Sequence, residues 1–172
     1  MPAGNTRDKL LFSQLKKSVD EASDKAEREK LVDSYAGSFS NKRYAFIIAN
    51  NARVLEQISS GKQAPQFDAI SLDNKPVTLT SLKGKHVVID VWATWCGPCK
   101  YESPYFEKMA IKYKDQPVQF VAASIDDNLQ QWFIDAKTKS KSVLQLHIND
   151  KKEFSKAYNI RGIPRFIFID PQ

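Results

Sequence analysis

The only two cysteines of this 172-residue chain, Cys96 and Cys99, lie close enough in the sequence to react with each other. They belong to the segment Trp95-Cys96-Gly97-Pro98-Cys99, which follows an apolar run and opens a helical pattern. At this spacing, two cysteines in the first turn of a helix share a face, so their sulfurs can bond or separate with little backbone movement. Such a bond closes too small a loop to stabilise a fold. We therefore predict that the pair is present for its reactivity.

The expected position of Cys96 at a helix N-terminus favours that reactivity. Unpaired N–H groups and the positive end of the helix dipole stabilise a thiolate, so the pKa of Cys96 should be lowered. Pro98 fits here because N–H groups of the first turn have no helical acceptors. Zinc is the alternative chemistry, but a zinc site needs two further ligands. The two histidines, His86 and His147, are far apart in the sequence and show no ligand spacing.

The segments around the cysteines alternate between strand and helix patterns. A near-continuous apolar run at 87–92, directly before the cysteines, is typical of a strand buried on both faces. The other expected elements are a hairpin around 73–75, strands at 118–124 and 166–169, and helices after Cys96, at about 129–139 and at 152–158. This alternation predicts an α/β domain with a mainly parallel sheet.

Residues 1–60 are expected to form a separate helical arm. Apolar residues recur at helical spacing up to Ala36, Gly37 ends that pattern, and Ser40 is suited to cap a second helix that runs to about Ile58. Residues 61–63 follow as a linker, and residues 64–172 form the α/β domain. We expect the arm to have a packing role, with partner binding as the alternative.

The charge of the chain does not indicate a particular class of binding partner. Lys and Arg number 26 against 20 Asp and Glu, a formal charge of +6, but the lysines are scattered apart from one cluster at 137–141. Nucleic-acid binding would need a basic stripe with aromatic residues placed for stacking, and neither is visible. No apolar run approaches the roughly 20 residues that a membrane helix needs, and no signal peptide is visible.

Several segments resemble the thioredoxin superfamily, and within it the TlpA/ResA branch. They are Ala64-Pro65-Gln66-Phe67, Ser81-Leu82-Lys83-Gly84-Lys85, Trp92-Ala93-Thr94-Trp95-Cys96, Cys99-Lys100-Tyr101-Glu102-Ser103-Pro104 and Gly162-Ile163-Pro164. The resemblance covers residues 64–170 and implies a thioredoxin-like fold, with a central mixed sheet flanked by helices and an N-terminal β-hairpin. The arm before it is similar to a helical extension of some Bacteroidetes members.

In that family the strand at 166–169 is followed by a turn, a final antiparallel edge strand and a closing helix. No residues remain after Gln172 to build them. The resemblance therefore implies a domain that is incomplete at its C-terminus, with these last two elements missing. We expect the strand at 166–169 to be an exposed apolar edge that is prone to pairing with another chain, so that the protein self-associates or is only marginally stable.

The resemblance assigns the catalytic roles. Cys96 would be the accessible nucleophile that attacks a substrate disulfide, and Cys99 the buried thiol that resolves the mixed disulfide. Asp90, six residues before Cys96, matches a buried acid of the family. A carboxyl in an apolar strand should have a raised pKa, which suits it to move the Cys99 proton through water. Glu102 matches an acid near the cysteines, and a solvated surface glutamate is its alternative.

The resemblance also implies a substrate-binding surface. Pro164 would be in the cis form, and the backbone of Ile163 would form hydrogen bonds with substrate. Trp95 would shield the disulfide and contact substrate, whereas Trp92 is expected to pack in the core. Arg165 replaces a residue that is often threonine, which favours acidic partners. The complete implied set is Trp95, Gly97, Pro98, Ile163 and Pro164.

The function implied is that of a thiol-disulfide oxidoreductase that reduces or interchanges protein disulfides. It would need no bound cofactor besides its own disulfide, and a partner thiol protein would supply its electrons. Its location would be extracytoplasmic, with a membrane tether in some members, and the alternative location is the cytoplasm. Other hypotheses are a disulfide oxidase or isomerase, a redox-inactive binding module, and a peroxiredoxin, a related family that shares the segment at 65–85.

Overall fold

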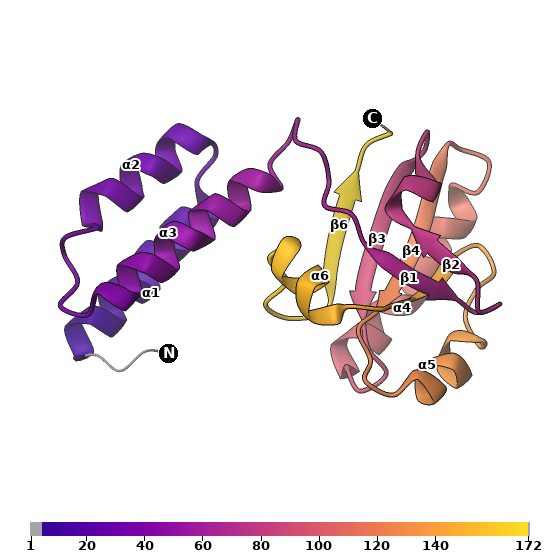
Figure 1. The fold of residues 1–172 in the computed structure, drawn as a ribbon. Coiled ribbons are helices and arrows are strands. Elements are labelled where there is room, and N and C mark those ends of the chain that lie inside the picture. Colours follow the sequence, from indigo (N-terminus) through magenta and orange to yellow (C-terminus); the bar gives the residue numbers. More distant parts are fainter. Residues whose placement is uncertain (1–4, 172) are drawn as a thin grey trace. The chain divides into compact units, whose positions relative to one another are not determined.

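The structure is a computed structural model that describes residues 5–171. The chain divides into two compact units, Met1–Gln63 and Ala64–Gln172 (Figure 1). The division falls at the end of the expected linker, at 61–63. The packing role expected for the arm, with partner binding as its alternative, stays a prediction. Residues 1–4 and 172, which the expected arm and domain include, lie outside the described part. No described helix is both long and apolar enough to cross a membrane.

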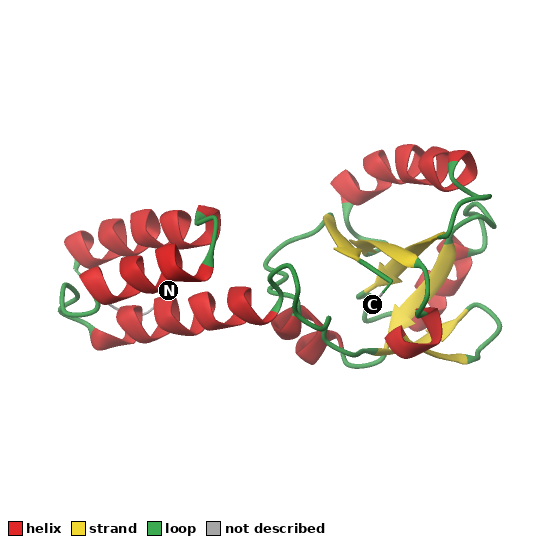
Figure 2. Cartoon of the chain, turned by 90° about the horizontal axis from the view of Figure 1, so that it is seen from above, coloured by secondary structure: helices red, strands yellow, loops and turns green. Residues whose placement is uncertain are grey.

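The described part of the first unit, residues 5–63, contains three helices where the sequence predicted two. They are α1 (Thr6–Glu21), α2 (Lys25–Tyr35) and α3 (Lys42–Gln57) (Figure 2). The first expected helix breaks at Ser23 because Asp24 caps α2 by accepting from the Glu27 N–H, while the Glu27 carboxylate accepts from the Ser23 N–H. The residue that caps α3 is Asn41 and not Ser40. Both corrections arise from side-chain caps, which override helical periodicity.

The helices of the first unit pack around one apolar cluster. Its buried members are Phe12, Leu15, Val19, Phe39, Tyr44 and Ile48. Asp8 is fully buried beside it, and its carboxylate accepts the backbone N–H groups of Ser40 and Asn41 at 3.3 and 2.9 Å. This contact ties α1 to the start of α3.

The second unit is built on a six-stranded sheet. Its elements are β1 (Asp68–Ser71), β2 (Pro76–Thr78), a short 3₁₀ helix (Leu79–Leu82), β3 (His86–Trp92), α4 (Gly97–Lys112), β4 (Val118–Ser124), α5 (Leu129–Ala136), β5 (Leu144–Ile148), α6 (Lys151–Ala157) and β6 (Arg165–Ile169). The strand order is β2-β1-β5-β4-β3-β6. Only the β3–β4 and β4–β5 pairs are parallel, and the other three pairs are antiparallel.

The mixed sheet confirms the fold that the resemblance implied and corrects the mainly parallel sheet predicted from alternation. Alternation of strands and helices cannot show that the β1–β2 hairpin pairs with β5, or that β6 runs antiparallel beside β3. Strand β5 was not predicted at all. Its polar residues, Gln145 and His147, are buried because β5 lies inside the sheet between β1 and β4.

Strand β3 sends alternate side chains to opposite faces of the sheet. Val87, Ile89 and Val91 join the apolar cluster that includes α6. Val88 and Trp92 join the cluster on the other face, which contains residues of α4 and α5. Asp90 lies between them in the sequence, so the alternation places it on the same face as α4. Figure 2 shows helices on both sides of the strands.

Strand β6 lies at an edge of the sheet and pairs only with β3 within the described residues. Phe168 is 76% exposed and Phe166 is 42% exposed, although the Phe166 ring stacks on Phe106 at 5.9 Å. The strand is therefore an apolar edge open to solvent, and the expected self-association through it stays a prediction.

Candidate active site

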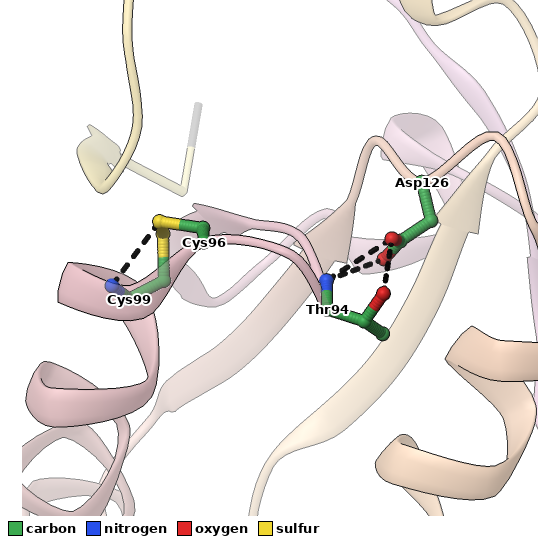
Figure 3. The surroundings of a disulfide bond; sticks show 4 residues. All are labelled: Thr94, Cys96, Cys99 and Asp126. Atoms are coloured by element: carbon green, nitrogen blue, oxygen red, sulfur yellow. Dashed lines mark hydrogen bonds between the residues drawn. A yellow bond between two sulfur atoms is a disulfide. The ribbon is translucent and has the colours of Figure 1, made fainter.

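Cys96 and Cys99 form a disulfide at the start of α4 (Figure 3). Cys96 is the N-cap residue, and its Sγ accepts a hydrogen bond from the Cys99 N–H at 3.2 Å. The helix therefore directs a free N–H at the sulfur that the sequence predicted to be activated. Both cysteines are buried in this oxidised form, Cys96 at 4% and Cys99 at 1% exposure. Cys96 is thus buried while it is bonded to Cys99, and the accessibility expected of the attacking thiol stays a prediction.

The residues on either side of Cys96 are exposed. Trp95 is 68% exposed, and Gly97 and Pro98 are exposed as well. The Ile163–Pro164 peptide bond is cis, and both residues are half-buried. The side chain of Ile163 packs against the cluster that contains the two cysteines. The five residues of the implied substrate surface thus lie at or near the surface, but their role in binding stays a prediction.

Asp90 is a buried carboxyl group on β3, 3% exposed. Its Oδ1 has no hydrogen-bond partner in the part of the chain that the structure describes. Burial raises the pKa of Asp90 to about 7, the positive charge of Lys139 lowers it, and the negative charge of Glu102 raises it. The raised pKa expected for this carboxyl is therefore present, and it allows Asp90 to exchange a proton near neutral pH.

A small cavity joins Asp90 to the disulfide. Its volume is about 10 Å³, and its lining includes Asp90, Cys99 and Lys139. Two more buried polar atoms, Trp92 Nε1 and Gln145 Oε1, belong to lining residues and find no partner among residues 5–171. A cavity of this size with several unpaired polar groups suits a single water molecule. Such a water would bring a proton carrier between Asp90 and Cys99.

Lys139 is a cationic residue in the lining of this cavity. It follows α5, and its Nζ donates to Ser103 Oγ at 2.8 Å and lies 3.8 Å from Glu107 Oε1, both on α4. The same Nζ lies 5.7 Å from the centre of the Trp92 ring. The sequence analysis recorded Lys139 only as part of a surface cluster. No local signal marks its role, since α5 and the loop after it bring it to α4 only in the folded chain.

Two further residues named in the sequence analysis, Trp92 and Glu102, lie in different environments. Trp92 packs in the core as predicted, 4% exposed. Glu102 is half-buried on α4, outside the lining of the small cavity, and acts on Asp90 only through its charge.

Within residues 5–171, no three His, Cys, Asp or Glu side chains are grouped so that they could hold a metal ion.

A buried carboxylate near the disulfide was missed by the sequence analysis. Asp126, just beyond β4, is 1% exposed and accepts hydrogen bonds from the N–H and the Oγ1–H of Thr94 (Figure 3). Thr94 lies two residues before Cys96. The sequence did contain a signal that could have identified Asp126, because it is an acidic residue just after an apolar strand. Functional side chains of α/β proteins gather at the carboxyl ends of parallel strands.

Residues 59–172 match the Redoxin family model. The chain belongs to the Redoxin family. It is 31% identical over 118 residues to the thiol-disulfide oxidoreductase ResA of Bacillus subtilis, covering 68% of this chain and 65% of that protein. It is 40% identical over 72 residues to ResA of Bacillus anthracis, covering 42% of each. The chain thus spans less than two thirds of these curated relatives.

Solved structures of Bacteroides proteins have a similar fold. The thioredoxin domain of a thiol-disulfide oxidoreductase from Bacteroides vulgatus is 30% identical, with a TM-score of 0.60 over 66% of this chain and 82% of that one. A thiol:disulfide interchange protein from Bacteroides sp. is also 30% identical, with a TM-score of 0.59 over 67% and 77%. Together with the ResA relatives, these structures confirm the predicted thioredoxin-like fold and the prediction that the chain is a ResA-like member of the thioredoxin superfamily.

Proposed function

We propose that this protein is a thiol-disulfide oxidoreductase that reduces or interchanges disulfides of other proteins. The observation that carries the proposal is the Cys96–Cys99 disulfide at the N-terminus of α4, with the buried carboxyl of Asp90 lining the same cavity as Cys99. The printed names of the relatives support this class of reaction. The redox group is the cysteine pair itself, so no bound cofactor is required.

The first step uses the reduced protein. The Cys96 thiolate, stabilised at the helix N-terminus, attacks one sulfur of a substrate disulfide. A Cys96–substrate bond forms, the substrate S–S bond breaks, and the second substrate sulfur leaves as a thiolate that takes a proton from solvent. Exposed Trp95, Gly97 and Pro98 surround the attacking residue and supply the surface against which a substrate chain rests.

The second step releases the substrate. Asp90, with its pKa raised to about 7 mainly by burial, accepts the Cys99 proton through a water in the small cavity. The Cys99 thiolate then attacks Cys96 Sγ, which forms the Cys96–Cys99 disulfide and expels the remaining substrate sulfur as a thiolate. The substrate disulfide has gained two electrons and the cysteine pair has lost them. A partner thiol protein must return those electrons before the next turnover.

The substrate surface and location complete the proposal. Ile163 packs against the cluster that contains the cysteines and precedes the cis-Pro164, and its backbone would bind an extended substrate segment. Arg165 is exposed next to them, which favours acidic substrates. We place the protein outside the cytoplasm on the basis of its resemblance to the ResA branch. Labelling of intact cells with a membrane-impermeant thiol reagent tests that location.

The equilibrium reduction potential of the cysteine pair tests both the activity and its direction. The protein is equilibrated in dithiothreitol or glutathione redox buffers, and the fluorescence of Trp92 and Trp95 is followed. Reference potentials run from about −270 mV for thioredoxin to about −120 mV for the oxidant DsbA. We expect about −250 mV or below, because the Gly-Pro pair between the cysteines resembles reducing members.

A potential above about −160 mV would identify a disulfide donor and reverse the direction. The Cys99→Ser variant, measured in the dithiothreitol buffers, is the control, because without the second thiol it cannot form the internal disulfide and should not show the transition of the parent. If the parent protein exchanges no disulfide, the hypothesis of a redox-inactive binding module is favoured. Consumption of hydrogen peroxide by the reduced protein would instead indicate a peroxiredoxin.

A further inference from the structure

The carboxylate of Asp126 is one of the most heavily hydrogen-bonded groups near the disulfide. Its two oxygens lie 3.0 and 2.9 Å from the Thr94 N, and its Oδ1 accepts from Thr94 Oγ1 at 2.6 Å (Figure 3). Its Oδ2 also accepts from Ser124 Oγ at 2.7 Å. Both oxygens therefore take part in hydrogen bonds. A carboxyl group this deeply buried is costly unless it is hydrogen-bonded, and this one is.

The backbone of Asp126 is held as well. Its carbonyl oxygen accepts from His147 Nε2 on β5 at 2.8 Å and from Lys151 Nζ on α6 at 2.8 Å. His147 is buried, and its ring packs beside that of Trp132. Hydrogen bonds therefore hold both the backbone and the side chain of Asp126, so its carboxylate is a rigid acceptor for Thr94.

Parallel pairing of β3 and β4 creates this contact. The register places Trp92 opposite Ser124, so Thr94 and Asp126 each come two residues after a matched pair at the same edge of the sheet. Thr94 lies in the turn closed by the hydrogen bond from the Cys96 N–H to Ala93 O, at 3.0 Å. A carboxylate that holds Thr94 thus holds the turn that ends at Cys96.

We propose that Asp126 is a positioning residue of the redox site, which holds the Ala93–Cys96 turn through Thr94 and thereby keeps the Cys96 sulfur at the N-terminus of α4. The inference rests on the proposed function, since it assigns Asp126 a part in activating Cys96. Its physical basis is that an N–H directed at a sulfur stabilises the thiolate only while the sulfur stays in place.

The direction in which the pKa of Cys96 changes distinguishes a positioning role of Asp126 from a direct effect of its charge. A negative charge near a thiolate disfavours the thiolate, so loss of the Asp126 charge alone would lower the pKa of Cys96. Loss of positioning would raise it, toward the ordinary thiol value of about 8.5. A purely structural role would lower the melting temperature and leave the pKa of Cys96 unchanged.

The test is the pH dependence of Cys96 alkylation by iodoacetamide in the reduced full chain, with Asp126→Asn as the first variant. We expect its Cys96 pKa to rise by about one unit, so that the whole pH profile of alkylation moves about one unit to higher pH and the rate well below the pKa falls by about tenfold. Asp127→Asn is the matched control. It removes the same charge one residue further on, from a side chain that is 99% exposed and that binds Lys151, and should leave the pKa of Cys96 unchanged.

Thr94 variants keep the test decisive if Asp126→Asn fails to fold. Thr94→Val removes only the hydroxyl donor and should move the pKa of Cys96 in the same direction by less, whereas Thr94→Ser retains the donor and should behave like the parent. A lowered or unchanged pKa of Cys96 in both Asp126→Asn and Thr94→Val would overturn the proposal. Alkylation needs no substrate turnover, so a parent that alkylates normally but exchanges no disulfide would refute the proposed function separately.

Discussion

Asp90 and Cys99 line the same cavity of about 10 Å³, although Asp90 lies within β3 and Cys99 in the first turn of α4. The alternation of side chains along β3 directs Asp90 toward the face that α4 covers. This places a carboxyl group that titrates near neutral pH beside the less exposed of the two sulfurs. The two cysteines are therefore chemically unequal, and each should respond differently to substitution.

Substitution of each cysteine should separate the two steps. Cys99→Ser retains the attacking thiol but removes the resolving one, so we expect it to accumulate a stable mixed disulfide with a substrate protein. Cys96→Ser should lose exchange activity. Non-reducing electrophoresis followed by mass spectrometry of the trapped species measures both outcomes. Exchange activity that survives in Cys96→Ser would contradict the assigned roles.

The stability of the oxidised protein should depend on Asp90. Its pKa is raised from 3.8 to about 7 by burial, so between these values the folded state keeps a proton that the unfolded state has lost. Stability should therefore fall as the pH rises through this range and stay low above pH 7. Asp90→Asn cannot ionise, and at pH 8 it should be more stable than the parent by up to about 4 kcal/mol.

Urea unfolding from pH 3.5 to 8 measures this difference, which should vanish at the acid end. Asp73→Asn, in the exposed β1–β2 turn, is the control and should show no comparable gain. The same Asp90→Asn protein should resolve mixed disulfides more slowly, because it has lost the acceptor of the Cys99 proton. A variant that is less stable at pH 8 than the parent would contradict the burial argument.

Lys139 should set the pH range of the second step. Its positive charge lowers the pKa of Asp90, so Lys139→Gln should raise that pKa above about 7. The rate of mixed-disulfide resolution should then reach its plateau at a higher pH, as followed by stopped-flow tryptophan fluorescence. Lys141→Gln, an exposed neighbour, should keep the parent profile. An equal shift caused by Lys139→Gln in an Asp90→Asn background would show that Lys139 acts elsewhere.

The exposed edge formed by β6 should make the chain self-associate. Phe168 is 76% exposed, and the outer edge of β6 is unpaired within the described residues. Phe168→Lys places a charge on that edge and should shift the protein toward the monomer in sedimentation-velocity experiments. Phe46→Lys, at a 72% exposed position of α3, controls for the loss of an exposed ring. A parent that stays monomeric at all concentrations would refute this prediction.

Local patterns predicted many of the elements that carry the site. The apolar runs of β3 and β4, the turn with a positive φ at Asn74, and the helix that begins beside Cys96 all appear where the sequence placed them. Each depends on residues close together in the chain. The break between α1 and α2 was also encoded locally, by Asp24 and Glu27, but helical periodicity concealed it.

By itself, the sequence determined the chemistry of the protein: two cysteines at the spacing of a redox pair, opening a helix after a buried strand. Only the tertiary structure decided which groups from distant segments are brought to the site. Strand direction, the place of β5, the approach of Lys139 to α4 and the contact of Asp126 with Thr94 all depend on pairing between distant segments. The β3–β4 register brings Thr94 and Asp126 together across 32 positions, and no pattern within either segment specifies that register.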